Sequence, residues 1–129
     1  MRKSCRCGSR ESFSDCCKPL LDGRRSSVTP EQLVRSRYTA YALGGYGDYL
    51  LQTWFPATAK GLIAADLSVV TRNWTALKIF ASGVDGNTGW VDFRATDQSA
   101  SGPSILHEKS VFTCATGIWL YIGGEVLSS

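Results

Sequence analysis

The sequence has little of what an exported or membrane protein carries. No apolar run in its 129 residues approaches the roughly 18 to 20 residues that a membrane-spanning helix needs. The basic N-terminus is followed directly by cysteines, serines and charges, so it lacks the apolar stretch of a signal peptide. We therefore expect a cytoplasmic protein without a membrane span, in a reducing compartment where cysteines persist as thiols.

Several motifs of catalysis and cofactor binding are absent as well. The sequence has no C-x-x-C pair, which excludes a thioredoxin-type redox centre. It also has no glycine-rich loop between a strand and a helix, which excludes a typical dinucleotide site. The single histidine, His107, lies far from the cysteines, so a zinc knuckle of the retroviral type is excluded too.

The net charge of +3 is small and unevenly spread along the chain. Residues 1–25 carry seven basic and three acidic side chains, whereas the rest of the chain carries seven basic and eight acidic ones. Thiolates gathered around a divalent ion would remove part of the basic excess. A nucleic acid partner is therefore not expected, because such proteins usually present a strongly basic surface.

What the sequence does have is a cysteine cluster near its N-terminus. Four of its five cysteines follow the pattern C-x-C-x8-C-C, namely Cys5, Cys7, Cys16 and Cys17. Disulfides, a redox pair, packing and a metal site are the explanations to weigh, and a reducing compartment argues against disulfides. Four thiolates suit tetrahedral Zn²⁺, one ion per chain, with iron or another thiophilic ion as alternatives. The fifth cysteine, Cys114, is expected to be a packed thiol in a strand.

Short features around the cysteines favour a closed metal site. Gly8 can adopt a positive φ angle, which lets backbone N–H groups approach the thiolates, and Ser9 can cap a short turn. Cys16 and Cys17 are adjacent, so we expect a helical turn that brings both sulfurs to one ion. Pro19 is expected to end that turn. Metal binding would supply much of the folding energy of so short a segment.

The remainder of the chain has the pattern of helices followed by strands. A predicted helix begins at Thr29 and ends before Gly44, and residues 46–54 and 58–72 are predicted to be helical as well. Beyond them the hydrophobic period changes to two, which predicts strands near residues 77–82, 90–95, 106–113 and 118–122. This order predicts an α+β domain in which helices pack on an antiparallel sheet.

The stretch CRCGS at residues 5–9, with Phe13 and the cysteine pair at 16–17, resembles the SEC-C motif. That motif is a small zinc-binding module named after the C-terminal tail of the SecA translocase motor. Three further stretches resemble the YchJ-like SEC-C proteins of bacteria: RSRYTAYALG at 35–44, GWVDFRA at 89–95 and LHEKSVF at 106–112. The resemblance covers nearly the whole chain, and the cysteine motif is its most specific part.

This resemblance implies a chain in two parts. Residues 1–25 would form the SEC-C-like zinc-binding module. Residues 26–129 would form a domain similar to the nuclear transport factor 2 superfamily, in which a curved sheet wraps around helices as a cone. In SecA the similar module contacts the SecB chaperone, so the resemblance implies a protein partner with an acidic surface. Members of that superfamily often dimerise, so we expect a monomer or a homodimer through the sheet.

Two functions from different classes fit these features. The first, which we favour, is a protein-interaction or adaptor module that binds its partner through the basic zinc segment. Its predicted contact residues are Arg6, Arg10, Phe13 and Lys18. The second is a small-molecule-binding or catalytic cone domain to which the zinc module is an accessory.

The cone function would use a polar pocket whose candidates are Arg35, Arg37, Asp92, His107, Glu108 and Ser110. Strand alternation places His107 on the opposite face from Glu108 and Ser110, so these three cannot act as one local group. Asp92 and His107 meet only if their strands pair in a suitable register, and they are the one candidate pair for an enzyme. We expect no catalytic residue, and we expect Glu108 to form an ion pair with Arg35 or Arg37.

Overall fold

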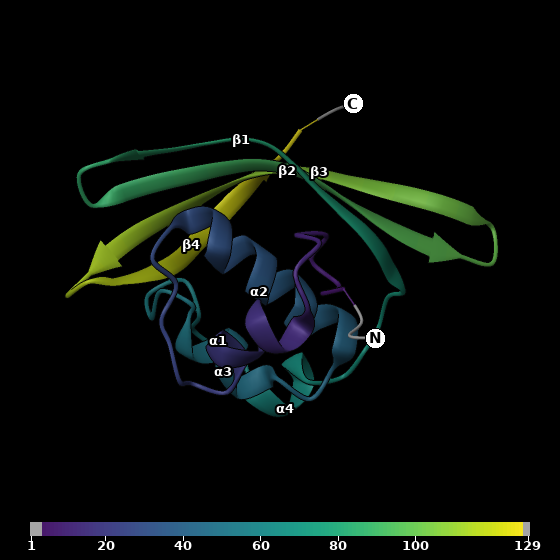
Figure 1. Cartoon of the computed structure of the whole chain (residues 1–129), viewed down its shortest axis with the longest axis horizontal. Coiled ribbons are helices and arrows are strands. Elements are labelled where there is room, and N and C mark those ends of the chain that lie inside the picture. Colours follow the sequence, from purple (N-terminus) through teal and green to yellow (C-terminus); the bar gives the residue numbers. More distant parts are fainter. Residues whose placement is uncertain (1–3, 128–129) are drawn as a thin grey trace.

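The computed structural model describes residues 4–127, in which helices lie against one face of a curved four-stranded sheet (Figure 1). The elements in chain order are η1 (Phe13–Asp15), α1 (Lys18–Leu21), α2 (Pro30–Leu43), α3 (Gly47–Gln52), α4 (Ala64–Leu67), β1 (Trp74–Asp85), β2 (Thr88–Ser99), β3 (Gly102–Ala115) and β4 (Ile118–Val126). This is the α+β arrangement that the sequence predicts. No helix of the described residues is long and apolar enough to cross a membrane.

Helix α2 begins and ends where local sequence signals place its caps. The Gln32 N–H donates to the Thr29 hydroxyl at 3.1 Å, and the Val28 N–H donates to Gln32 Oε1 at 2.9 Å. Pro30 lies in the first turn, where its missing N–H costs no helical hydrogen bond. Gly44 follows the last residue with a φ of 77°, which only glycine adopts easily.

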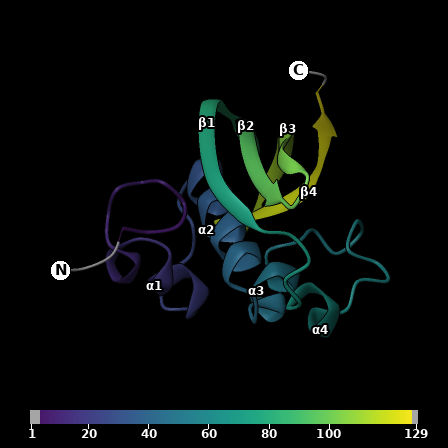
Figure 2. The same cartoon turned by 90° about the vertical axis from the view of Figure 1, so that its right-hand side faces the viewer.

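The sheet has the order β1-β2-β3-β4, and each strand pairs antiparallel with the next. Bulges interrupt the register at Phe80 in β1, between Ile79 and Ala81, and at Ile122 in β4, opposite Val111 and Phe112. Bulges increase local twist and bend, which suits a sheet that curves over α2 (Figure 2). The strands are longer than the alternation of apolar residues predicts, because their ends continue into exposed hairpins.

Two clusters of buried side chains hold the helices to the sheet and the N-terminal segment to α2. The sheet cluster consists of Leu33, Val34, Val91, Phe112 and Trp119. The second cluster contains three cysteines, Cys5, Cys7 and Cys17, together with Leu21, Tyr38, Ala40, Leu50 and Ala95. The cysteine segment therefore packs against α2 rather than standing apart from it.

Two local predictions are wrong. Residues 58–72 do not form one helix, since only Ala64–Leu67 is helical and Gly61, with a φ of 84°, lies before it. Pro19 does not end a helical turn either. It occupies the first turn of α1, where a proline is tolerated, and the Leu21 N–H donates to the Cys17 carbonyl at 2.9 Å.

The contact between α3 and α4 gives a test of the fold. A Cβ atom on Gly47 would lie 1.7 Å from the Ala64 carbonyl oxygen, so Gly47→Ala must push the two helices apart. We expect it to lower the free energy of unfolding by about 3 kcal/mol. Gly123→Ala is the matched control, because a Cβ there meets no atom within 4 Å. Urea denaturation of both variants measures the difference, and equal stabilities would contradict this packing.

Candidate metal centre

The four N-terminal cysteines come together as the sequence predicts. Their sulfur atoms all lie within 4.8 Å of one another, with 3.6 Å between those of Cys7 and Cys16 and 3.9 Å between those of Cys16 and Cys17. Four sulfurs placed about 2.3 Å from a central zinc-sized ion would stand about 3.8 Å apart. Cys16 is half-buried and the other three are buried. The cluster is thus compatible with the tetrahedral binding of one metal ion.

Two tight turns bring the cysteines together. Cys5 and Cys7 lie in a loop closed by the Cys5 N–H, which donates to the Glu11 carbonyl at 2.7 Å. Gly8 has a φ of 81°, the positive angle that the sequence predicts. The Ser9 hydroxyl accepts from the Glu11 N–H at 3.2 Å and lies 3.1 Å from Cys16 Sγ. The predicted capping role of Ser9 is therefore confirmed, and the same hydroxyl also contacts the cluster.

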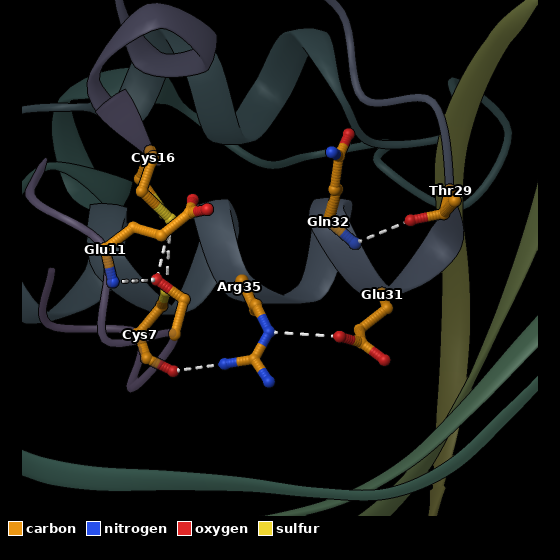
Figure 3. A network of polar contacts seen from close by, with 9 residues as sticks. Cys7, Glu11, Cys16, Thr29, Glu31, Gln32 and Arg35 are labelled. Carbon is orange, nitrogen blue, oxygen red and sulfur yellow. Dashed lines mark hydrogen bonds and ion pairs between the residues drawn. The ribbon is translucent and has the colours of Figure 1, made fainter. Parts of the chain in front are cut away.

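Helix α2 supplies a second layer of contacts around the cysteines (Figure 3). Arg35 Nη1 donates to the Cys7 carbonyl at 2.6 Å, while its Nε donates to Glu31 at 3.2 Å. The Thr39 hydroxyl lies 3.4 Å from Cys17 Sγ and donates to the Arg35 carbonyl at 3.0 Å. The sequence pattern gave no sign of Thr39, because its contact depends on how α2 docks against the loop.

The thiols of the cluster do not titrate alike. Hydrogen bonds from Cys17 and Cys5 hold the pKa of the Cys7 thiol far below its usual range. Contacts with Cys5 and Cys7 raise the pKa of Cys17, and burial raises that of Cys16 to about 11. The pKa of Cys7 is therefore shifted in the opposite direction to the pKa values of its two neighbours Cys16 and Cys17.

The four predicted partner-binding residues occupy different environments. Arg6 Nη2 donates to the Trp74 carbonyl at 2.7 Å, so this side chain ties the loop to the start of β1. Phe13 is half-buried against the cysteine-containing core cluster. Lys18 pairs with Asp22 at 3.1 Å and keeps 41% of its side chain exposed, and Arg10 is exposed. Arg6 and Arg10 are exposed and Lys18 is partly exposed, and the partner-binding role of all four residues stays a prediction.

The six predicted pocket residues do not share one pocket. Asp92 Oδ1 and His107 Nε2 meet at 2.6 Å, and His107 Nδ1 is buried without a hydrogen-bond partner among the described residues. This pair lies on the sheet face opposite Glu108, as the alternation predicts. Arg35 does not line the cavity of the cone but holds the Cys7 loop instead.

Arg37, Glu108 and Ser110 do line a common cavity, but their contacts differ from the predicted ion pair. Glu108 accepts hydrogen bonds from the hydroxyl groups of Ser110 and Tyr121. In the described part of the chain, Arg37 makes no salt bridge, and its Nη1 donates to the Leu50 carbonyl and Thr53 Oγ1. The predicted pairing of Glu108 with Arg35 or Arg37 is therefore wrong, because each group finds a nearer partner. Cys114 is half-buried against the sheet cluster, as expected of a packed thiol.

Residues 29–124 match the family model described as YchJ, middle NTF2-like domain. The chain belongs to the YchJ-like SEC-C family. A UPF0225 protein of Streptomyces coelicolor is 39% identical over 127 residues, which cover 95% of this chain and 95% of that protein. A UPF0225 protein of Deinococcus radiodurans is 37% identical over 121 residues, covering 93% of this chain and 87% of that one.

Solved structures agree with this YchJ-like assignment. The solution structure of a SEC-C motif containing protein from Rhodopseudomonas palustris has a TM-score of 0.88 and 33% identity, covering 98% of this chain and all of that one (100%). The crystal structure of a sec-c motif containing protein from Psychrobacter arcticus has a TM-score of 0.83 and 23% identity, covering 98% and 84%. The second supports the fold alone. The predicted division of the chain at residue 25 stays a prediction.

The contact between Arg35 and Cys7 can be tested with Co²⁺ as a probe ion. We expect Arg35→Met to weaken Co²⁺ binding by about tenfold to 100-fold, because the Cys7 loop loses the group that orients it. Arg24→Met is the matched control, since within residues 4–127 Arg24 forms an ion pair only with Asp22, and its side chain is 68% exposed. Competition with a chelator gives both affinities, and equal values would show that Arg35 does not orient the site.

Proposed function

We propose that the four cysteines bind one Zn²⁺ per chain as a structural site. The observation that carries this proposal is the convergence of four sulfur atoms within 4.8 Å, with three of the cysteines buried. Soft thiolate ligands in a tetrahedral arrangement favour zinc over harder divalent ions. Four protein ligands also fill the coordination sphere of zinc, whereas catalytic zinc sites keep one position for water or substrate.

The bound ion would hold the N-terminal segment on the rest of the fold. The segment has little regular structure of its own, since η1 and α1 comprise three and four residues. It is attached to β1 through Arg6 and to α2 through the Cys7 carbonyl. A metal that draws four thiolates together contributes its binding energy to folding, so the ion would fix this segment in place.

The zinc-bearing segment would act as a protein-interaction module for a partner with an acidic surface. Arg10, Arg24 and Arg25 are exposed on it, and Lys18 is partly exposed. The similar protein from R. palustris is a SEC-C motif containing protein, which supports the same module type. Complementary charge speeds association and selects partners, which suits a recruiting role.

We further propose that the protein is no enzyme and works in the cytoplasm, where thiols stay reduced. The pair formed by His107 and Asp92 is the nearest approach to a catalytic dyad, and it lies on the sheet face away from the cone cavity. A homodimer through the sheet stays a prediction, which exposed Phe80 and Ile105 support.

Native mass spectrometry tests the zinc proposal directly. We expect one zinc per chain, and four thiols that react with a maleimide only after a strong chelator has removed the ion. Cys16→Ser should lose the metal and melt at a lower temperature, because one ligand of the site is missing. Cys114→Ser, the matched control, should keep both metal and stability. A metal-free wild type with freely reactive thiols would overturn the proposal.

Charge reversal on the module tests its interaction role, with the chaperone SecB as the probe partner. We expect the double variant Arg10→Glu, Lys18→Glu to bind SecB at least tenfold more weakly than the wild type, because opposing charges replace complementary ones. Lys60→Glu with Lys109→Glu is the control, since both lysines are exposed and lie outside the module. Biolayer interferometry measures all three. Equal losses in both double variants, or no binding by the zinc-loaded wild type, would contradict this role.

A further inference from the structure

A cavity of about 290 Å³ lies between α2 and the concave side of the sheet. Its lining is mainly aromatic and aliphatic and includes Tyr41, Trp54, Trp74 and Phe112. Cavities of this size and lining are typical of sites for small molecules. None of the cysteines lines it, so it is separate from the metal centre.

The cavity contains an unusual cation. Arg37 is only 6% exposed, yet its guanidinium makes no salt bridge in the described part of the chain. Its Nη1 donates to the Leu50 carbonyl at 2.7 Å and to Thr53 Oγ1 at 2.8 Å, which ties α2 to the end of α3. Its Cζ lies 4.7 Å from the ring centre of Trp54 and 4.8 Å from that of Tyr121.

These contacts leave the guanidinium without an anionic partner. Within the described residues its partners are the Leu50 carbonyl, the Thr53 hydroxyl and the Tyr41 phenol, all of them uncharged, and both Arg37 and Tyr41 line the cavity. Burial lowers the pKa of this group, which means that the fold disfavours its charge. A buried charge without a partner is costly, and a bound anion would compensate it.

The carboxylate in the cavity lining, that of Glu108, already accepts hydrogen bonds from two hydroxyl groups. Glu108 accepts from Ser110 and, at 3.3 Å, from the Tyr121 hydroxyl. Burial, together with the charge of Glu108, raises the pKa of Tyr121 to about 12, so that phenol stays protonated and keeps donating. A second cation, Arg72, also lines the cavity, but it already pairs with Asp97 at 2.9 Å. Among the described lining residues Arg37 is thus the guanidinium without a carboxylate partner, which favours an anionic ligand.

We propose that this cavity binds a small aromatic carboxylate. The guanidinium of Arg37 can present two N–H donors to the two oxygens of a carboxylate, and the Tyr41 phenol lies beside it as a further polar group. The aromatic lining suits a ring, and the presence of Glu108 disfavours a doubly charged group such as a phosphate. The proposal concerns binding at a second site and does not depend on the metal or on a partner protein.

The test uses 2-naphthoate and its neutral isostere 2-naphthamide as probes of the zinc-loaded protein. We expect the wild type to bind the carboxylate at least tenfold more tightly than the amide by calorimetry. Arg37→Gln should remove this preference and leave binding of the amide unchanged. Arg94→Gln is the matched control, because Arg94 lies beside Phe80 and does not line the cavity, and it should keep the preference. NMR shifts caused by naphthoate should centre on Trp54 and Phe112.

A second variant covers the case in which Arg37→Gln does not fold, since Arg37 also braces α3. Ala95 is 3% exposed and lines the cavity, so Ala95→Met keeps both arginines and fills the space. It should abolish binding of both probes. The proposal is overturned if the wild type binds neither probe at millimolar concentration, if it binds both equally, or if the shifts map outside the cavity. None of these outcomes bears on the zinc site, whose occupancy the same samples report by mass.

Discussion

The docking of the cysteine loop on α2 is the contact on which the rest of the structure depends. Arg35 reaches the Cys7 carbonyl at 2.6 Å, and Thr39 reaches the Cys17 sulfur at 3.4 Å. Both residues lie on one side of α2, one helical turn apart. The N-terminal segment has too little regular structure to fold by itself, so its position is set jointly by this helix and by the four sulfurs. Loss of the α2 contacts would leave the segment held by the sulfur cluster alone, and loss of the sulfur cluster would leave it held by α2 alone.

The same helix serves two sites because neighbouring positions face opposite ways. Arg35 and Arg37 are two residues apart, which on a helix corresponds to about 200° of rotation. Arg35 therefore turns to the cysteines while Arg37 turns to the cone cavity, and Leu33 and Val34 pack on the sheet. The two arginines look interchangeable in sequence, yet one holds the loop of the cysteine cluster and the other supplies a buried cation. A disturbance of α2 would reach both sites.

Local patterns predicted much of this fold and the convergence of the four cysteines. The spacing of the cysteines, the caps of α2 and the alternation in four strands each depend on neighbours in sequence. They can therefore be predicted without knowledge of tertiary contacts. The contact of Arg35 with Cys7 joins residues 28 positions apart, and no local pattern encodes it. The prediction of a helix over residues 58–72 is wrong for a related reason. The Gly47 N–H donates to the Ser68 hydroxyl at 2.8 Å, and tertiary contacts of this kind replace a continuous helix.

Strand register decides which polar side chains meet, and the sequence alone does not give that register. Alternation placed His107 and Glu108 on opposite faces, but only the pairing of Arg94 with His107 brings Asp92 within reach of the histidine. The bulge at Ile122 in β4 likewise sets Tyr121 opposite Phe112, and the Tyr121 hydroxyl reaches Glu108. Glu108 is thereby satisfied on the sheet, and Arg37 is left across the cavity without a carboxylate. The absence of a carboxylate partner for Arg37 thus follows from strand register. Because Glu108 bonds to Tyr121 on β4, the guanidinium of Arg37 on α2 is available to an external anion.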